Sequence, residues 1–214
     1  MIEGIIFDMD GVIVDSEVHW KDPQARFIQT LVGELTIEDE RRFIGMSIPD
    51  IYNILYDKYK LNLSLKQFME EYDKIAYIIY NKKVSMVPKC LELIKTLKSK
   101  NFQLGLASSS PKNWIDIVLK RFELAVYFDV ITSGDEVKKS KPHPEIFLKT
   151  ADKMKMNPEK CVVIEDSRNG VIAAISSGMK VIGLKTKEYD QDLSYANIVI
   201  DNLEKISLDK IKGL

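Results

Sequence analysis

The amino-acid sequence predicts an α/β fold, a doubly wound parallel sheet with a helical domain inserted after the first strand. Two observations predict the sheet and its helices. Short apolar runs rich in valine and isoleucine recur along the chain, and stretches of helical periodicity separate most of them. This alternation is typical of parallel sheets that helices cover on both faces. A third observation predicts the insert, because one region of about 64 residues has helical patterns without a convincing strand.

Six apolar runs are predicted as strands that are buried on both faces, because each is short and continuous rather than alternating. They cover residues 4–7, 103–107, 128–132, 161–164, 181–184 and 198–200. Four helical patterns lie between the later runs, at residues 91–97, 114–122, 146–151 and 171–175. Pro111 and Pro144 precede two of them, where the fixed φ of proline suits helix entry. Gly178 follows the last, where glycine commonly ends a helix.

The region between the first and second predicted strands is expected to form a separate helical domain. Its helical patterns lie at residues 25–31, 51–59 and 65–79, with acidic and basic residues mixed through them. We therefore assign residues 17–81 to the helical insert, and residues 1–16 and 82–214 to the α/β core.

The composition indicates no charged macromolecule as partner. The chain has 31 lysines and arginines against 32 acidic residues, so no net field favours nucleic acid or an anionic membrane. We find no signal peptide and no run of the roughly 18 apolar residues that a membrane span needs. Cys90 and Cys161 lack metal or redox spacing, so we expect buried, reduced thiols in a cytoplasmic protein. We expect a monomer.

Polar side chains follow four of the predicted strands at the point where each strand ends. Ligands of open α/β sheets bind beyond the carboxyl ends of the strands, so we expect these side chains at one rim of the sheet. They are Asp8 and Asp10 after the first strand, Ser108, Ser109 and Ser110 after the second, Lys141 beyond the third, and Glu165 and Asp166 after the fourth.

The clustered carboxylates predict a site for a divalent cation. Asp8 and Asp10 are spaced by two residues, and like charges held so close repel each other unless a cation or a shared proton compensates. Hard carboxylate oxygens suit Mg²⁺, which keeps several waters and a substrate phosphate in its shell. Lys141 and the serines supply donors for phosphate oxygens. The sequence therefore predicts Mg²⁺ as cofactor and a small phosphorylated metabolite as ligand.

Four motifs together resemble those of the haloacid dehalogenase-like hydrolase superfamily. They are DMDGV, LASSS, the lysine of SKPHPEIF, and VVIEDSRNG, which occur in this order over almost the whole chain. The helical insert between the first two motifs resembles the cap of the branch that contains β-phosphoglucomutases and small phosphatases. The resemblance implies a core that performs the chemistry and a cap that selects the substrate.

The resemblance also implies roles for the two aspartates of the first motif. Asp8 is the expected nucleophile, whose carboxylate attacks phosphorus and forms an aspartyl-phosphate. Asp10 is the expected general acid and base. On an extended chain, residues i and i+2 face the same way, so both carboxylates can reach one phosphoryl group. Gly11 is expected to let the chain turn sharply after them.

Further roles follow from the same resemblance. The expected metal ligands are Asp8, Asp10 through its backbone carbonyl, and Asp166, with Glu165 alongside. The remaining motif residues are expected to bind the phosphate: Ser108 by its hydroxyl, Ser109 by its backbone, and Lys141 by bridging phosphate and Asp8.

Two cap residues are expected to contact the substrate by resemblance. His19 lies close to a histidine position of the branch, although DSEVH is one residue shorter than the family spacing. Lys74 matches a cap lysine that contacts substrate. The loop FIGMSIPD departs from the mutase version, because Ile48 stands where mutases carry the arginine that grips a distal phosphate.

These observations favour a Mg²⁺-dependent phosphatase acting on a sugar or polyol phosphate. The alternative is β-phosphoglucomutase or a related phosphosugar mutase. A dehalogenase fits poorly, because that chemistry lacks the second acid that Asp10 provides. A non-catalytic phosphometabolite-binding protein is a further alternative, since fold does not fix function, although such a protein needs no nucleophile and acid together.

Overall fold

The computed structural model describes residues 1–36, 39, 43, 46–186 and 191–214. Its centre is a six-stranded sheet in the order β3-β2-β1-β4-β5-β6, in which every neighbouring pair is parallel. The strands are β1 Gly4–Phe7, β2 Gln103–Ala107, β3 Val130–Thr132, β4 Cys161–Glu165, β5 Lys180–Leu184 and β6 Ile198–Ile200. This arrangement confirms the predicted doubly wound parallel sheet.

All six strands lie where the sequence predicts them. β3 begins two residues later than predicted, because residue 128 still follows the 3-10 turn Ala125–Tyr127. The helices of the core are α5 Cys90–Ser99, α6 Lys112–Arg121, α7 Glu145–Lys153, α8 Arg168–Ser176 and α9 Leu208–Lys212. Gly178 has φ +82° beyond the end of α8, as the sequence predicts for a residue that ends a helix.

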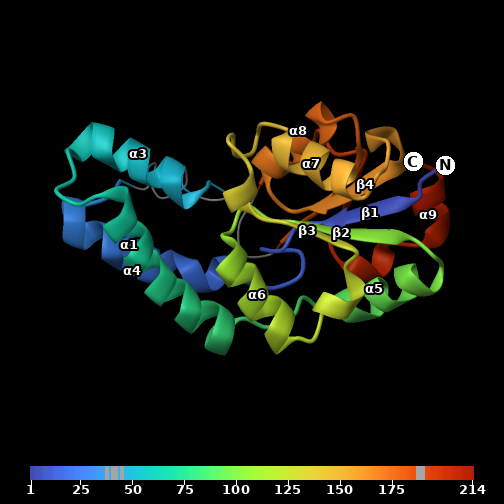
Figure 1. The fold of residues 1–214 in the computed structure, drawn as a ribbon, viewed down its shortest axis with the longest axis horizontal. Coiled ribbons are helices and arrows are strands. Elements are labelled where there is room, and N and C mark those ends of the chain that lie inside the picture. The colour runs from blue at the N-terminus through green and yellow to red at the C-terminus, as the bar shows by residue number, and fades with distance from the viewer. Residues whose placement is uncertain (37–38, 40–42, 44–45, 187–190) are drawn as a thin grey trace.

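Helices cover both faces of the sheet, with α7 and α8 on one side and α5, α6 and α9 on the other (Figure 1). The side chains of β1 alternate between these layers. Ile5 and Phe7 pack in the larger core cluster with α5 and α6, whereas Ile6 packs with α7 and α8. Burial on both faces explains why the strands are continuous apolar runs in the sequence.

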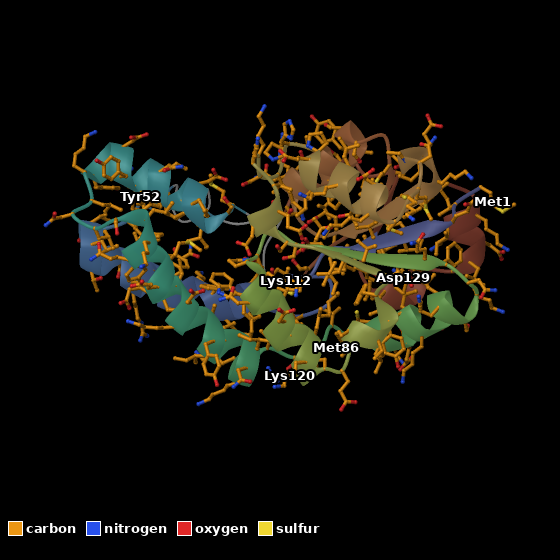
Figure 2. All side chains as sticks on the ribbon, in the orientation of Figure 1. Met1, Tyr52, Met86, Lys112, Lys120 and Asp129 are labelled. Atoms are coloured by element: carbon orange, nitrogen blue, oxygen red, sulfur yellow. The ribbon has the colours of Figure 1, made fainter. Side chains whose placement is uncertain are left out.

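Three described helices between β1 and β2 form a separate group beyond the carboxyl ends of the strands (Figure 1). They are α1 Glu17–Val32, α3 Ile48–Tyr59 and α4 Leu65–Ile78, and a π-helical segment, Ile79–Lys83, returns the chain to the core. We call this group the cap. Tyr52 on α3 and Met1 lie at opposite ends of the molecule (Figure 2).

An aromatic cluster forms the centre of the cap. Phe68 and Tyr72 on α4 pack against Phe27 and Trp20 on α1, with ring centroids 5.3–5.7 Å apart, and the rings of Phe68 and Tyr72 lie 4.9 Å from each other. α4 begins with a capping box in which Ser64 and Gln67 satisfy each other's backbone donors, so local sequence sets where this helix starts. Within the described ranges, no helix combines the length and apolar character that crossing a membrane requires.

Candidate active site

The end of β1 lies at the point where the strand order reverses, between β2 and β4. Asp8 follows the strand and donates its backbone N–H to the carbonyl of Ile164 at 3.0 Å. Gly11 has φ +78°, and its N–H reaches the Val14 carbonyl at 2.7 Å. The predicted sharp turn is therefore present, and it directs the two aspartates to the ligand-binding edge of the sheet.

Lys141 joins two of the predicted site residues. Its Nζ lies 2.6 Å from Asp8 Oδ1 and 2.8 Å from Glu165 Oε2, and its side chain is only 4% exposed. Glu165 is held further by Ser167, whose backbone N–H and hydroxyl both donate to Oε1 at 3.0 and 2.8 Å. Residues from three distant parts of the chain thus form one buried, charge-assisted network.

Three buried carboxylates provide a donor set for a metal ion. Asp8, Glu165 and Asp166 each offer an oxygen within 4.8 Å of the others. Three carboxylates against the one ammonium of Lys141 leave excess negative charge, which fits a hard divalent cation such as Mg²⁺. The side chain of Asp10 is not in this group, and its backbone carbonyl as a metal ligand stays a prediction.

Burial and the neighbouring charges shift the pKa values of Asp8 and Glu165 in opposite directions. Burial raises the pKa of Asp8 well above its usual range, and the charges of Glu165 and Asp10 add to this, while Lys141 opposes it. Burial would also raise the pKa of Glu165, but the charge of Lys141 and the hydrogen bonds from Lys141 and Ser167 outweigh it and lower that pKa. A bound cation would favour the carboxylate form of Asp8, which a nucleophile needs.

Hydroxyl groups hold the carboxylate of Asp10. Ser16 Oγ and Tyr80 OH donate to Oδ1 at 2.6 and 2.7 Å, and Ser110 Oγ donates to Oδ2 at 3.0 Å. Trp20 Nε1 donates in turn to Tyr80 OH at 3.2 Å. Ser16 and Tyr80 belong to the two connections between core and cap, so both connections contact the expected general acid.

Of Ser108 and Ser109, the two serines after β2 that were expected to bind phosphate, only one lines the cavity. Ser109 lines the cavity of the site. Ser108 is 1% exposed, with its hydroxyl accepting from Ser110 N at 3.1 Å and lying 3.5 Å from Asp10 Oδ2. The loop is held by close packing, because a Cβ on Gly134 would lie 2.2 Å from the Ser109 carbonyl oxygen.

A cavity of about 860 Å³ separates this rim from the cap. Asp8, Asp10, Lys141, Glu165 and Asp166 line its core side. Its cap side is largely apolar. Among the described cap residues that line it, the apolar ones include Val18, Ala25, Ile28, Leu35, Phe43, Met46, Ile48 and Ile51. The polar ones on the cap helices and the loop before α3 are Glu17, Lys21, Gln24 and Ser47.

The structure does not bring His19 and Lys74 to this cavity. His19 lies about 200° around α1 from the cavity-lining Glu17, given 3.6 residues per turn, and its Nε2 is 3.7 Å from Asp15 Oδ1. Lys74 is 68% exposed and pairs with Glu71 at 2.7 Å. It lies on the outside of α4, because the inner side is occupied by Phe68, Tyr72 and Ala76.

Several residues at the site were not identified from the sequence. Glu17 lines the cavity, Tyr80 binds Asp10, and Trp114 lines the cavity while its Nε1 donates to Asp73 Oδ1 at 2.5 Å. Trp20 and Trp114 pack against each other in a tilted arrangement, with ring centroids 5.2 Å apart. A sequence signal existed for Glu17 alone, since it is an acid directly after the first connection.

Residues 5–184 match the family described as haloacid dehalogenase-like hydrolase. The chain belongs to this family, as its four motifs predict. The match spans the whole catalytic rim and the cap.

The relatives include phosphatases and a mutase. The chain is 34% identical over 181 residues to the phosphorylated carbohydrates phosphatase of Thermotoga maritima, covering 85% of this chain and 84% of the relative. It is 28% identical to hexitol phosphatase B of Escherichia coli K12, covering 97% and 96%. The crystal structure of β-phosphoglucomutase from Clostridium difficile superposes with a TM-score of 0.81 at 30% identity, covering 100% and 96%.

Proposed function

We propose that the protein is a Mg²⁺-dependent phosphatase that hydrolyses the monophosphate of a small sugar or polyol through an aspartyl-phosphate on Asp8. The observation that carries this proposal is the buried network in which Lys141 bridges Asp8 and Glu165 at the floor of the cavity. Relatives named as a phosphorylated carbohydrates phosphatase and a hexitol phosphatase support the substrate class.

Asp8, Glu165 and Asp166, with the backbone carbonyl of Asp10, would hold the cation. When bound, Mg²⁺ supplies positive charge that offsets the repulsion between the Asp8 carboxylate and the phosphoryl oxygens. Lys141 adds a second positive charge beside Asp8, and Ser109 provides a backbone donor at the cavity wall for the same oxygens.

The chemical step uses both aspartates. A carboxylate oxygen of Asp8 attacks phosphorus while the bond to the leaving oxygen breaks, and Asp10 donates a proton to that oxygen. Water then attacks the phosphorus of the aspartyl-phosphate, Asp10 accepts the proton of this water, and inorganic phosphate leaves with Asp8 restored. The hydroxyls of Ser16, Tyr80 and Ser110 keep Asp10 at the cavity edge.

The cap side of the cavity favours hydrolysis over mutase chemistry. A mutase must hold a second phosphate while the first is transferred, for which a bidentate arginine on the cap is suited, and Ile48 stands where the mutases of the branch carry that arginine. Ile48 and Ile51 line the α3 side of the cavity, and Lys21 is the sole cap cation among the described lining residues. Similarity to β-phosphoglucomutase keeps a phosphosugar mutase as the second candidate.

The test is phosphate release from p-nitrophenyl phosphate and from a panel of sugar and polyol phosphates, with Mg²⁺ and with EDTA. We expect release that requires Mg²⁺ and falls by about 10³-fold or more in Asp8→Asn. Conversion of β-glucose 1-phosphate into glucose 6-phosphate without free phosphate would identify a mutase. Tight binding of one ester without turnover would identify a binding protein.

We also infer a cytoplasmic, monomeric enzyme that uses neither nucleic acid nor membrane. Cys90 and Cys161 are buried free thiols, which suits a reducing compartment.

A further inference from the structure

The first helix of the cap presents polar side chains to the cavity. Glu17, Lys21 and Gln24 all line it, and their spacing of four and three residues places them on one side of α1. Glu17 is the first residue of α1 and directly follows Ser16, which binds Asp10. Glu17 therefore lines the cavity from the cap side, and its carboxylate is close enough to Asp10 and Glu165 for their charges to act on it.

The environment of Glu17 is unfavourable for a carboxylate. Burial raises its pKa to about 7, and the negative charges of Asp10 and Glu165 add to this. Among the described residues, none forms a hydrogen bond or an ion pair with its side chain, and Lys21, one turn further along the helix, does not pair with it. A carboxylate in the first turn of a helix interacts favourably with the helix dipole. An exposed carboxylate would gain the same interaction without the cost of desolvation.

Ligands that donate hydrogen bonds would relieve this environment. A hydroxyl group of a leaving group is such a donor, whereas a second phosphate would bring two further negative charges close to Glu17, Asp10 and Glu165. The same part of the cavity contains the tilted pair of Trp20 and Trp114, which offers an apolar wall for the carbon chain of a sugar or polyol.

We propose that Glu17 is a specificity-determining residue: it accepts hydrogen bonds from hydroxyl groups of a neutral leaving group and disfavours a leaving group that carries a second phosphate. This inference rests on the proposed function and narrows its substrates to monophosphates of polyhydroxylated carbon chains.

Three esters with one six-carbon chain test the proposal: sorbitol 6-phosphate, sorbitol 1,6-bisphosphate and n-hexyl phosphate. Rates are measured at pH 8 with Mg²⁺. The wild type should prefer sorbitol 6-phosphate over both others in kcat/KM. In Glu17→Gln, each preference should shrink roughly 10-fold or more, mainly through KM, because a hydrogen bond to a charged group contributes this much.

Two further variants complete the experiment. Glu17→Asp keeps the charge but shortens the side chain, so it should retain the preference against the bisphosphate while losing the preference over hexyl phosphate. If Glu17→Gln does not fold, the rates of Glu17→Asp with the three esters test the specificity role. Glu71→Gln is the matched control, because Glu71 is a cap acid paired with Lys74 outside the cavity, and both preferences should stay at the wild-type values.

The outcomes separate this inference from the proposed function. If Glu17→Gln changes kcat/KM by the same factor for all three esters, or for none, the specificity role is wrong. If the wild type hydrolyses p-nitrophenyl phosphate but shows no preference among the three esters, the specificity role fails and the phosphatase stands. If the wild type hydrolyses none of the four esters, the proposed function itself fails.

Discussion

Charged side chains differ in burial between the rim of the sheet and the cap. At the rim, Lys141 and Glu165 are 4% and 1% exposed and pair at 2.8 Å. Glu165 is the last residue of β4, whereas Lys141 lies in the segment between β3 and α7. In the cap, the pairs Lys58–Asp39 and Lys74–Glu71 involve lysines that are 47% and 68% exposed. The difference fits the proposed function, in which fixed charges at the rim serve the chemical step and a mostly apolar cap wall leaves room for variation in the substrate.

Replacing Lys141 gives the largest effect that we expect on the rim side of this comparison. Lys141→Met leaves Asp8 and Glu165 buried without their cation, so the free energy of unfolding should fall by about 3–5 kcal/mol. Urea unfolding at pH 8 in EDTA measures this, and addition of Mg²⁺ should restore part of the loss.

The matched control is Lys98→Met, which breaks the partly exposed pair with Asp129 (labelled in Figure 2). We expect a loss below about 1 kcal/mol for this surface pair. Equal losses in the two variants would contradict the contrast between rim and surface.

Gly170→Ala should damage the rim through the position of Glu165. A Cβ at Gly170 would lie 2.0 Å from Glu165 Cδ, so the carboxylate that holds Lys141 must move. A displacement of about 1 Å can cost roughly 100-fold in rate, and we expect such a loss in kcat/KM. Gly178→Ala is the control. It should lower stability by about 1 kcal/mol through its φ of +82°, with kcat/KM within twofold of wild type.

Glu17 should make stability fall as pH rises. Its pKa is raised from 4.5 to about 7 in the folded protein, so the folded state holds more protons than the unfolded state between these values, and the penalty is complete above pH 7. Glu17→Gln should therefore raise the free energy of unfolding at pH 8 by up to about 3 kcal/mol. Denaturant unfolding in EDTA at pH 4 and pH 8 checks this, and an equal gain at both pH values would exclude the titration as its cause.

Lys74→Ala should have the smallest effect and sharpens the comparison on the cap side. The side chain is exposed and paired with Glu71 on the outside of α4, so we expect KM to change by less than about twofold and stability by less than about 1 kcal/mol. A tenfold rise in KM would instead support the substrate contact that the family resemblance implies.

The fold and most of the rim could be predicted from sequence. β1 and β4 are continuous apolar runs, and the acids that follow them, Asp8, Glu165 and Asp166, do meet in the structure. Their meeting was predictable because the carboxyl ends of adjacent parallel strands lie at one edge. Lys141 could be assigned only through its motif, since its position depends on a loop rather than on a strand.

The cap residues show where sequence reasoning ended. His19 and Lys74 were expected at the substrate, yet Glu17 of the cap and Trp114 of the core helix α6 line the cavity instead. Helical periodicity predicts that a helix has an apolar side, but it does not reveal which of the other sides faces a neighbouring domain. Likewise, the contact of Tyr80 with Asp10 joins residues that are 70 positions apart.

By itself, the sequence determined the alternation of strands and helices, the place of the insert and the acids at the sheet edge. These features follow from local periodicity and from the direction of parallel strands, which are properties of short segments. The tertiary structure alone decided which cap side chains enter the cavity and how the hydroxyls of Ser16, Tyr80 and Ser110 surround Asp10. Those contacts depend on how α1 and α4 are rotated and packed against the core, and this rotation is set by the burial of side chains distant in sequence.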